Sequence, residues 1–152
     1  MSLERTLVLV KPDGVQRGLV GEVVGRLERR GLQLVAMKLM RMSEELAGRH
    51  YAEHTEKPFF PSLVGFITSA PVVAMVWEGP GAVGMVRGIM GATNPANAAP
   101  GTIRGDLAVS IGMNVIHGSD SVERAAQEVA LFFGDDELLA WDRTLSRWLL
   151  DD

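Results

Sequence analysis

The first thirty residues change from one hydrophobic pattern to another, and this change restricts the possible folds more than any other feature. Residues 6–10 (TLVLV) form an apolar run rich in β-forming residues, which predicts a buried strand. Residues 11–14 (KPDG) predict a turn. Beyond it, apolar residues recur with the i, i+3, i+4, i+7 spacing of an amphipathic helix, at Val20, Val23, Val24 and Leu27. We expect Gly31 to end that helix, and the helix to pack on a sheet.

The rest of the chain continues the alternation. Further strands are expected at residues 32–42, at 72–77 and at a short segment ending at 115–116. Further helices are expected from Ser43 through His54, from the Pro58–Pro61 region to about residue 68, over 82–90, and from a cap at Asp120 or Ser121. In the last case Glu123 is a capping-box partner for Asp120.

Helices interleaved with few strands predict an α/β sandwich, with helices packed on a sheet of about four strands. Periodicity does not determine the strand order, and the strand at 32–42 could pair in either direction. Residues 91–106 form a long irregular segment, and such loops in compact domains are usually functional or disordered. The tail contains Trp141 and Trp148 and is expected to pack over the core or a neighbouring subunit.

Length and composition indicate an ordinary globular protein. The 152 residues suit one domain, residues 1–152, with 47% hydrophobic and 22% charged residues. A formal net charge of −4 argues against general binding to nucleic acid or anionic membranes, although a local basic pocket remains compatible with it. The chain has no cysteine, its amino terminus does not resemble a signal peptide, and its strongest apolar run spans only residues 72–77. We therefore expect a soluble, cytoplasmic domain.

Several common catalytic motifs are absent. The sequence has no GxxxxGK[ST] phosphate loop, no HExxH zinc pair and no GxSxG nucleophile elbow. His50 and His54 have the i, i+4 spacing of a zinc pair, but the sequence offers no third ligand nearby.

Polar residues at the edges of the predicted elements point instead to a phosphate pocket. The set comprises Lys11, Arg87, Thr93, Arg104, Asn114 and His117. Arginine and lysine match the charge of phosphate, and arginine can bind it with two hydrogen bonds. Taken singly, Lys11 could be a solvated lysine and Arg87 could extend to solvent from an apolar helix face.

His117 is the candidate nucleophile of this set. A neutral imidazole has a free ring nitrogen near physiological pH and can attack phosphorus. Gly118 would leave room for a phosphoryl group, and the helix that starts near Ser121 would help stabilise the anion. Glu128 could hold the protonated ring nitrogen. The alternatives are a structural core histidine and a surface glutamate.

Four stretches resemble the nucleoside diphosphate kinase family in order along the chain. They are TLVLVKPDGVQRGLVGEV, HYAEHTEKPFFPSLVGFI, GATNPANAAPGTIRGD and NVIHGSDS, the last of which matches the family signature NxxHGSD. The resemblance implies a ferredoxin-like βαββαβ sandwich with a four-stranded antiparallel sheet covered by helices. It also implies transfer of the γ-phosphoryl group of ATP or another nucleoside triphosphate to a nucleoside diphosphate, by a ping-pong mechanism through a phosphohistidine.

The resemblance further implies a role for each matching residue. His117 would be the nucleophile, positioned by Tyr51, Ser119 and Glu128. Lys11 and Asn114 would bind the ribose hydroxyls and nearby phosphate oxygens, and Phe59 would stack on the base. The phosphates would be held by His54, Arg87, Thr93 and Arg104. Mg²⁺ would be held by the nucleotide phosphates without protein ligands, and the protein would be a homo-oligomer, a hexamer or a tetramer.

Two rival functions remain at this stage. One is a catalytically silent nucleotide-binding or regulatory domain of the same fold, against which the joint presence of His117, Tyr51, Asn114, Ser119 and Glu128 argues. The other is a nucleic-acid-binding protein, against which the acidic balance and the lack of an RNP1-like aromatic motif argue.

Overall fold

The computed structural model describes residues 2–151. Its strands are β1 (Leu3–Val10), β2 (Gln33–Met40), β3 (Val72–Pro80) and β4 (Ile116–Gly118). Its α-helices are α1 (Pro12–Gln16), α2 (Val20–Arg30), α3 (Glu44–His50), α4 (Phe60–Ile67), α5 (Ala82–Met90), α6 (Ile103–Leu107) and α7 (Val122–Phe132). Short 3₁₀ turns lie at Ala52–His54, Pro95–Asn97, Asp135–Glu137 and Ser146–Trp148.

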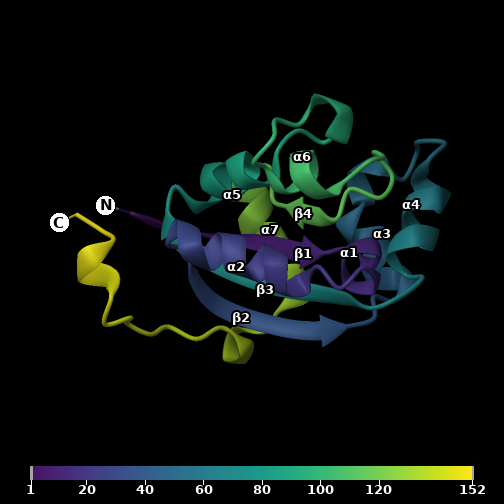
Figure 1. The fold of residues 1–152 in the computed structure, drawn as a ribbon. Coiled ribbons are helices and arrows are strands. Elements are labelled where there is room, and N and C mark those ends of the chain that lie inside the picture. The colour runs from purple at the N-terminus through teal and green to yellow at the C-terminus, as the bar shows by residue number, and fades with distance from the viewer. Residues whose placement is uncertain (1, 152) are drawn as a thin grey trace.

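The four strands form one antiparallel sheet in the order β2-β3-β1-β4 (Figure 1). β1 pairs with β3 along its whole length and with β4 at residues 8–10. The strand order interleaves the two βαβ halves, which is the ferredoxin-like arrangement that the family resemblance implied. The structure also settles the pairing of β2, which runs antiparallel to β3.

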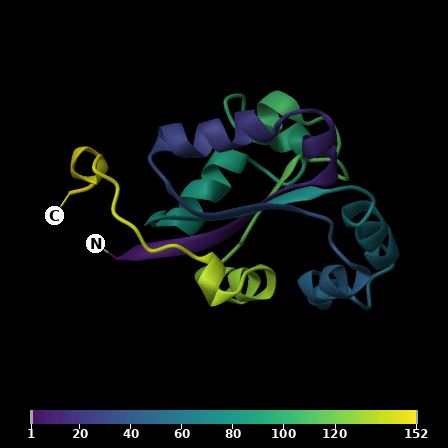
Figure 2. The same cartoon turned by 90° about the horizontal axis from the view of Figure 1, so that it is seen from below.

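Helices cover both faces of the sheet (Figure 2). Helices α2, α5 and α6 cover one face and enclose a core that includes Val8 and Val10. Helices α3, α4 and α7 cover the other face, whose core includes Leu7 and Leu9. Successive side chains of a strand point to opposite faces, so a central strand between two helical layers must be apolar at every position. This explains the unbroken apolar run at residues 6–10.

Several predicted boundaries need correction. Residues 11–14 do not form a simple turn, because Pro12 begins the short helix α1, where its fixed φ and missing N–H are tolerated. Helix α3 ends at His50, so Tyr51 is its C-cap and His54 belongs to a separate 3₁₀ turn. The segment 91–106 contains a 3₁₀ turn and most of α6.

The predicted helix ends agree better with the structure. Gly31 ends α2 with φ 108°, a left-handed conformation that favours glycine. Helix α5 has the predicted bounds, Ala82–Met90. Of the two candidate caps for α7, Ser121 is the one observed, since its hydroxyl accepts the N–H of Arg124. The capping box built on Asp120 is therefore wrong.

The tail follows the first residues of β2. The indole N–H of Trp141 donates to the carbonyl of Leu34, and the Arg143 guanidinium donates to the carbonyls of Gly31 and Leu32. Trp148, by contrast, is 74% exposed and does not pack over this chain's core, so of the two expected positions only contact with a neighbouring subunit is left for it. Among residues 2–151, no helix is both long and apolar enough to cross a bilayer.

Candidate active site

Most of the predicted site residues line one cavity of about 240 Å³, at the end of β1 and beside β4. Nine of them are brought together there: Lys11, Tyr51, His54, Arg87, Thr93, Arg104, Asn114, His117 and Glu128. Ser119 lies buried behind the cavity, and Phe59 lies next to it, with its ring 5.5 Å from the His54 ring. They come from α5, α6, α7, β4, the 3₁₀ turn at Ala52–His54 and the loops between elements, so only the fold could bring them together.

His117 is held in one orientation by Glu128. Its Nε2 lies 2.9 Å from Oε1 of Glu128, and the imidazole side chain is 23% exposed. A carboxylate accepts hydrogen bonds and cannot donate them, so Nε2 carries the proton of the neutral ring. The lone pair is therefore on Nδ1. The hydrogen bond to Glu128 thus determines which ring nitrogen of His117 has the free lone pair.

Glu128 is itself tightly held, so the surface alternative for this residue is wrong. It is only 3% exposed, accepts a hydrogen bond from the Ser119 hydroxyl at 2.7 Å, and forms an ion pair with Nε of Arg124 at 3.2 Å. Burial alone would raise the pKa of this carboxyl. The hydrogen bonds and charges of its neighbours, His117 foremost, outweigh burial and lower the pKa to about 2. Glu128 is thus an anion at any pH at which the protein works.

The backbone before His117 is strained. Val115 has φ 74°, an outlier for a β-branched residue. Its N–H donates to the buried carboxylate of Asp13 at 3.0 Å, and its carbonyl accepts the N–H of Lys11 at 2.9 Å. A Cβ on Gly14 would lie 2.9 Å from that carbonyl, so only glycine allows this approach. These contacts fix the entry into β4 and hence the position of His117.

Gly118 has a packing role that the sequence did not indicate. A Cβ at this position would lie 2.5 Å from the sulfur of Met90 and 3.0 Å from Cγ1 of Val86. Helix α5 therefore fills the space on that side of Gly118, and glycine lets β4 and α5 pack closely. Gly118 also lines the cavity beside His117.

The cavity collects cationic side chains that repel one another. Burial and the charge of Arg104 lower the pKa of Lys11 to about 8, and burial and the charge of Arg87 lower that of Arg104 to about 10. Lys11 donates to Oδ1 of Asn114 at 2.8 Å, whose amide in turn donates to the carbonyl of Thr93. Such a cluster costs stability in the free protein, and an anion placed in it would relieve the repulsion. Strained charge clusters of this kind are typical of functional sites.

The two arginines are held differently. The guanidinium of Arg104 is buried and donates to the carbonyls of Gly91, Asn114 and Ile116. Arg87 is exposed on α5 and makes one bond, to the carbonyl of Gly118 at 3.3 Å. Arg104 is therefore preorganised, whereas Arg87 is free to move toward a ligand.

An aromatic group forms the wall on the α3 side. The Tyr51 ring lies 4.7 Å from that of His50 and 6.3 Å from that of His54. Burial and the nearby Glu128 charge raise the pKa of Tyr51 to about 12, so its hydroxyl stays protonated. Phe59 is 48% exposed and offers an open ring at the rim. An exposed aromatic face beside a cationic cavity can hold a planar ring attached to a phosphate chain.

Two further residues belong to this site and were missed by the sequence reasoning. His50 is 3% exposed, with its ring edge-on to that of His117 at 4.7 Å. Burial and the charge of His117 lower the pKa of His50 to about 3, so it stays neutral. Arg124 links Glu128 to the carbonyl of His50. Only the four-residue spacing of Arg124 and Glu128 on one helix could have signalled that pair.

The site suits a metal that arrives with a ligand better than one held by the protein. Ligand atoms of His50, His117 and Glu128 lie within 4.8 Å of one another, but the Glu128 carboxylate already has two hydrogen bonds and an ion pair, and the cavity is cationic. On the open side the cavity has two exposed carboxylates, Glu53 and Asp120. Two carboxylates do not make a cage for a hard cation, which prefers six or more oxygen ligands.

Comparison with known proteins gives a consistent result. A sequence model described as nucleoside diphosphate kinase matches residues 4–138. The chain is 59% identical over 150 residues to a nucleoside diphosphate kinase of Archaeoglobus fulgidus and 61% identical over 150 residues to one of Symbiobacterium thermophilum, covering 99% of each protein in both cases. The structure superposes with a TM-score of 0.96 on a halophilic nucleoside diphosphate kinase from Halobacterium salinarum in complex with CDP, at 58% identity over 99% of this chain and all of that one.

Proposed function

Because this chain belongs to the nucleoside diphosphate kinase family, we propose that it transfers the γ-phosphoryl group of a nucleoside triphosphate such as ATP to a nucleoside diphosphate, through a phosphohistidine at His117. The observation that carries the proposal is the hydrogen bond between Nε2 of His117 and the buried carboxylate of Glu128. It leaves the Nδ1 lone pair for attack in a cavity lined by cations. Residues 1–152 act as one domain in this proposal.

In the first half-reaction, Nδ1 of His117 attacks the γ-phosphorus. The N–P bond forms while the bond from phosphorus to the bridging oxygen breaks, and the nucleoside diphosphate leaves with that electron pair. Nε2 keeps its proton throughout, and Glu128 stabilises the positive charge that develops on the ring. Arg87, Arg104 and Lys11 stabilise the charge that spreads over the phosphate oxygens.

In the second half-reaction, a different nucleoside diphosphate occupies the same cavity and its terminal oxygen attacks the phosphohistidine. The N–P bond breaks and returns its electron pair to Nδ1, which restores the free enzyme. One site used twice gives ping-pong kinetics. The N–P bond and the phosphoanhydride are of similar reactivity, so neither half-reaction traps the phosphoryl group.

The remaining site residues bind and orient the nucleotide. Phe59 stacks on the base, Lys11 and Asn114 hold the ribose hydroxyls and the adjoining phosphate oxygens, and His54 and Thr93 join the two arginines at the phosphates. Tyr51 and Ser119 position His117, the latter through its bond to Glu128. A divalent cation, which we propose is Mg²⁺, would be held by the nucleotide phosphates and would neutralise part of their charge.

We also propose that the protein works as a homo-oligomer, hexamer or tetramer, in the cytoplasm. Exposed apolar side chains at Leu39, Val109, Ile111 and Met113 support contact with further copies of the chain. The cytoplasm is where nucleoside triphosphates are abundant, and a chain without cysteine suits a reducing compartment.

The test begins with turnover. Purified protein, ATP, Mg²⁺ and a second nucleoside diphosphate should yield the corresponding new triphosphate. With γ-labelled ATP and no acceptor, the protein should carry a label that is stable to alkali, labile to acid and discharged by any nucleoside diphosphate. His117→Ala should abolish the label, whereas His50→Ala, which keeps the nucleophile, should retain it. An acid-stable label, as a phosphoserine on Ser119 would give, contradicts the mechanism. Nucleotide binding without any label would favour the silent-domain alternative.

A further inference from the structure

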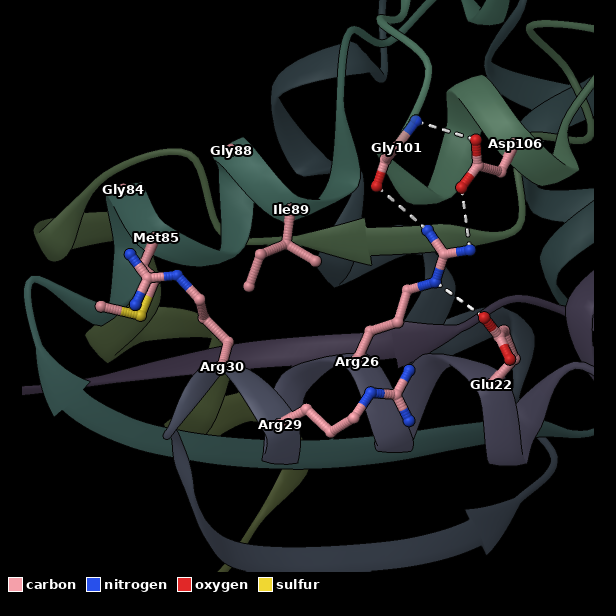
Figure 3. A pocket seen from close by; sticks show the side chains of 10 residues that line it. All are labelled: Glu22, Arg26, Arg29, Arg30, Gly84, Met85, Gly88, Ile89, Gly101 and Asp106. Carbon is pink, nitrogen blue, oxygen red and sulfur yellow. Dashed lines mark hydrogen bonds and ion pairs between the residues drawn. The ribbon is translucent and has the colours of Figure 1, made fainter. Parts of the chain in front are cut away.

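Arg26 contacts the end of the segment 91–106, which carries Thr93 and Arg104. It lies on α2, in a cleft of about 840 Å³ between α2, α5 and α6 (Figure 3). Its Nε donates to Glu22 at 2.8 Å, one terminal nitrogen donates to the carbonyl of Gly101 at 3.2 Å, and the other lies 2.9 Å from Oδ2 of Asp106. All of its nitrogens are therefore engaged, and the side chain is only 18% exposed.

Asp106 closes these contacts into a ring. Its second carboxylate oxygen accepts the N–H of Gly101 at 2.8 Å, so the backbone N–H and carbonyl of this one residue are held from two sides, as Figure 3 shows. Gly101 has φ 94°, which favours glycine. The ring of Arg26, Gly101 and Asp106 thus fixes the backbone at the residue where the loop turns into α6.

Helix α6 needs such an anchor. It has only five residues, too few for a helix to persist by itself. Its N-cap is Thr102, the neighbour of Gly101, whose hydroxyl accepts the N–H of Gly105 at 3.0 Å. The ring therefore holds the backbone just before the helix, at Gly101, and also holds a side chain within the helix, at Asp106.

Arg104 lies between those two anchors. It is two residues before Asp106, and its buried guanidinium lines the nucleotide cavity on the opposite side of α6 from Arg26. If the ring opens, α6 can shift, and the three carbonyl bonds that aim Arg104 must shift with it. A shift of about 1 Å in a preorganised group is enough to lower activity substantially.

We propose that Arg26 is a positioning residue for phosphate binding, which acts through the ring with Gly101 and Asp106 to hold α6 and aim Arg104 into the cavity. The identity of the ligand rests on the proposed function. Arg26 lies outside the site and tunes the affinity of the site for nucleoside diphosphates.

The chain offers a matched control. Arg29 is on the same helix and lines the same cleft, but it makes no ion pair or side-chain hydrogen bond with any of residues 2–151. Arg26→Met and Arg29→Met remove the same group and keep a similar aliphatic chain. Arg26→Lys restores a charge that cannot reach three acceptors at once, so it should rescue binding only in part.

The experiment measures ADP affinity by calorimetry in wild type, Arg26→Met, Arg26→Lys, Arg29→Met, Arg104→Ala and the double variant Arg26→Met/Arg104→Ala. Amide hydrogen exchange of residues 101–106 is measured in parallel. We expect Arg26→Met to weaken ADP binding about 10- to 100-fold and Arg29→Met to leave it within about twofold. In the Arg104→Ala background, adding Arg26→Met should weaken ADP binding by less than about twofold. Amide exchange at Gly101 and Gly105 should be faster than in wild type when Arg26 is replaced by Met, and unchanged in Arg29→Met.

Two results would overturn the proposal: unchanged ADP affinity in Arg26→Met, or the same loss in the Arg104→Ala background as in wild type. The latter would mean a general structural effect. Turnover by the wild-type protein tests the function separately, because a protein that bound ADP but transferred no phosphoryl group would refute the proposed function while the affinities still decided the role of Arg26.

Discussion

Replacing Glu128 with glutamine tests the central argument about His117. Glutamine has the shape of glutamate but no charge, and only one of its two terminal atoms is an acceptor. In Glu128, Oε1 accepts bonds from His117 and Ser119, and Oε2 forms the ion pair with Arg124. The amide N–H₂ group of glutamine must therefore face either His117 or Arg124. The ring that becomes positively charged during phosphoryl transfer loses its anionic partner.

The magnitude follows from the bond that is lost. A hydrogen bond to a charged group contributes about 1.5–3 kcal/mol, and this one strengthens as charge develops on His117. At about 1.4 kcal/mol for each factor of ten, phosphorylation of Glu128→Gln should be roughly 10- to 150-fold slower than that of wild type. Nucleotide affinity should change little, because Glu128 is buried behind the imidazole.

The assay is single-turnover labelling with γ-labelled ATP in a rapid-quench instrument, with ADP affinity measured separately. Glu123→Gln is the matched control, since Glu123 is an exposed glutamate on the same helix. It should label at the wild-type rate. A labelling rate for Glu128→Gln within twofold of wild type would refute the claim that this carboxylate fixes and stabilises the imidazole.

The same variant has a defined effect on acid stability. The pKa of Glu128 is about 2 in the folded protein, below the value of about 4.3 for an unfolded chain. Its stabilising contribution is therefore complete above pH 4.3 and is lost as the pH falls toward 2. The difference in unfolding free energy between wild type and Glu128→Gln should shrink across that interval in chemical denaturation experiments.

Three further changes test other parts of the site. Arg87→Ala should lower kcat/KM about 100-fold, because a charge-assisted bond to phosphate is lost, and steady-state kinetics should show little change for Arg29→Ala. Phe59→Ala should raise KM for purine and pyrimidine diphosphates alike, consistent with stacking energies of about 1–3 kcal/mol per base; an effect on one base alone would mean that the base is read by hydrogen bonds. His50 has a pKa of about 3 when folded and about 6.5 when unfolded, so the unfolding free energy should fall as the pH drops from 6.5 toward 3, by at most about 1.4 kcal/mol per pH unit. The unfolding free energy of His50→Asn should depend less steeply on pH over that interval than that of wild type. An equal dependence would assign the titration to another group.

Local sequence determined the elements with a strong period or a strong terminal residue. The apolar run at residues 6–10, the stripe of α2 and the left-handed Gly31 were readable because each depends on contacts within a few residues. The cap of α7 was narrowed only to Asp120 or Ser121, and the structure decided for Ser121. The strand order was not readable from the periodicity, because it depends on pairings between residues far apart in the chain, such as Val8 with Met75 and with Gly118. The motifs identified the family, and through it implied the fold and the residues to inspect.

Only the tertiary structure decided how those residues work together. By spacing alone, Glu128 suited the surface better than a site, until the packing of α7 on the sheet buried its carboxylate beside His117 and made it an acceptor for that ring. Gly118 looked like space for a phosphoryl group, but the fold also uses it to let β4 pack closely on α5. Arg26 was an ordinary helix residue until the loop at Gly101 reached it across 75 positions of sequence. In each case the sequence specified the chemical group, and its partner was set by burial and long-range contact, because a side chain's hydrogen bonds depend on what the fold places within about 3 Å of it.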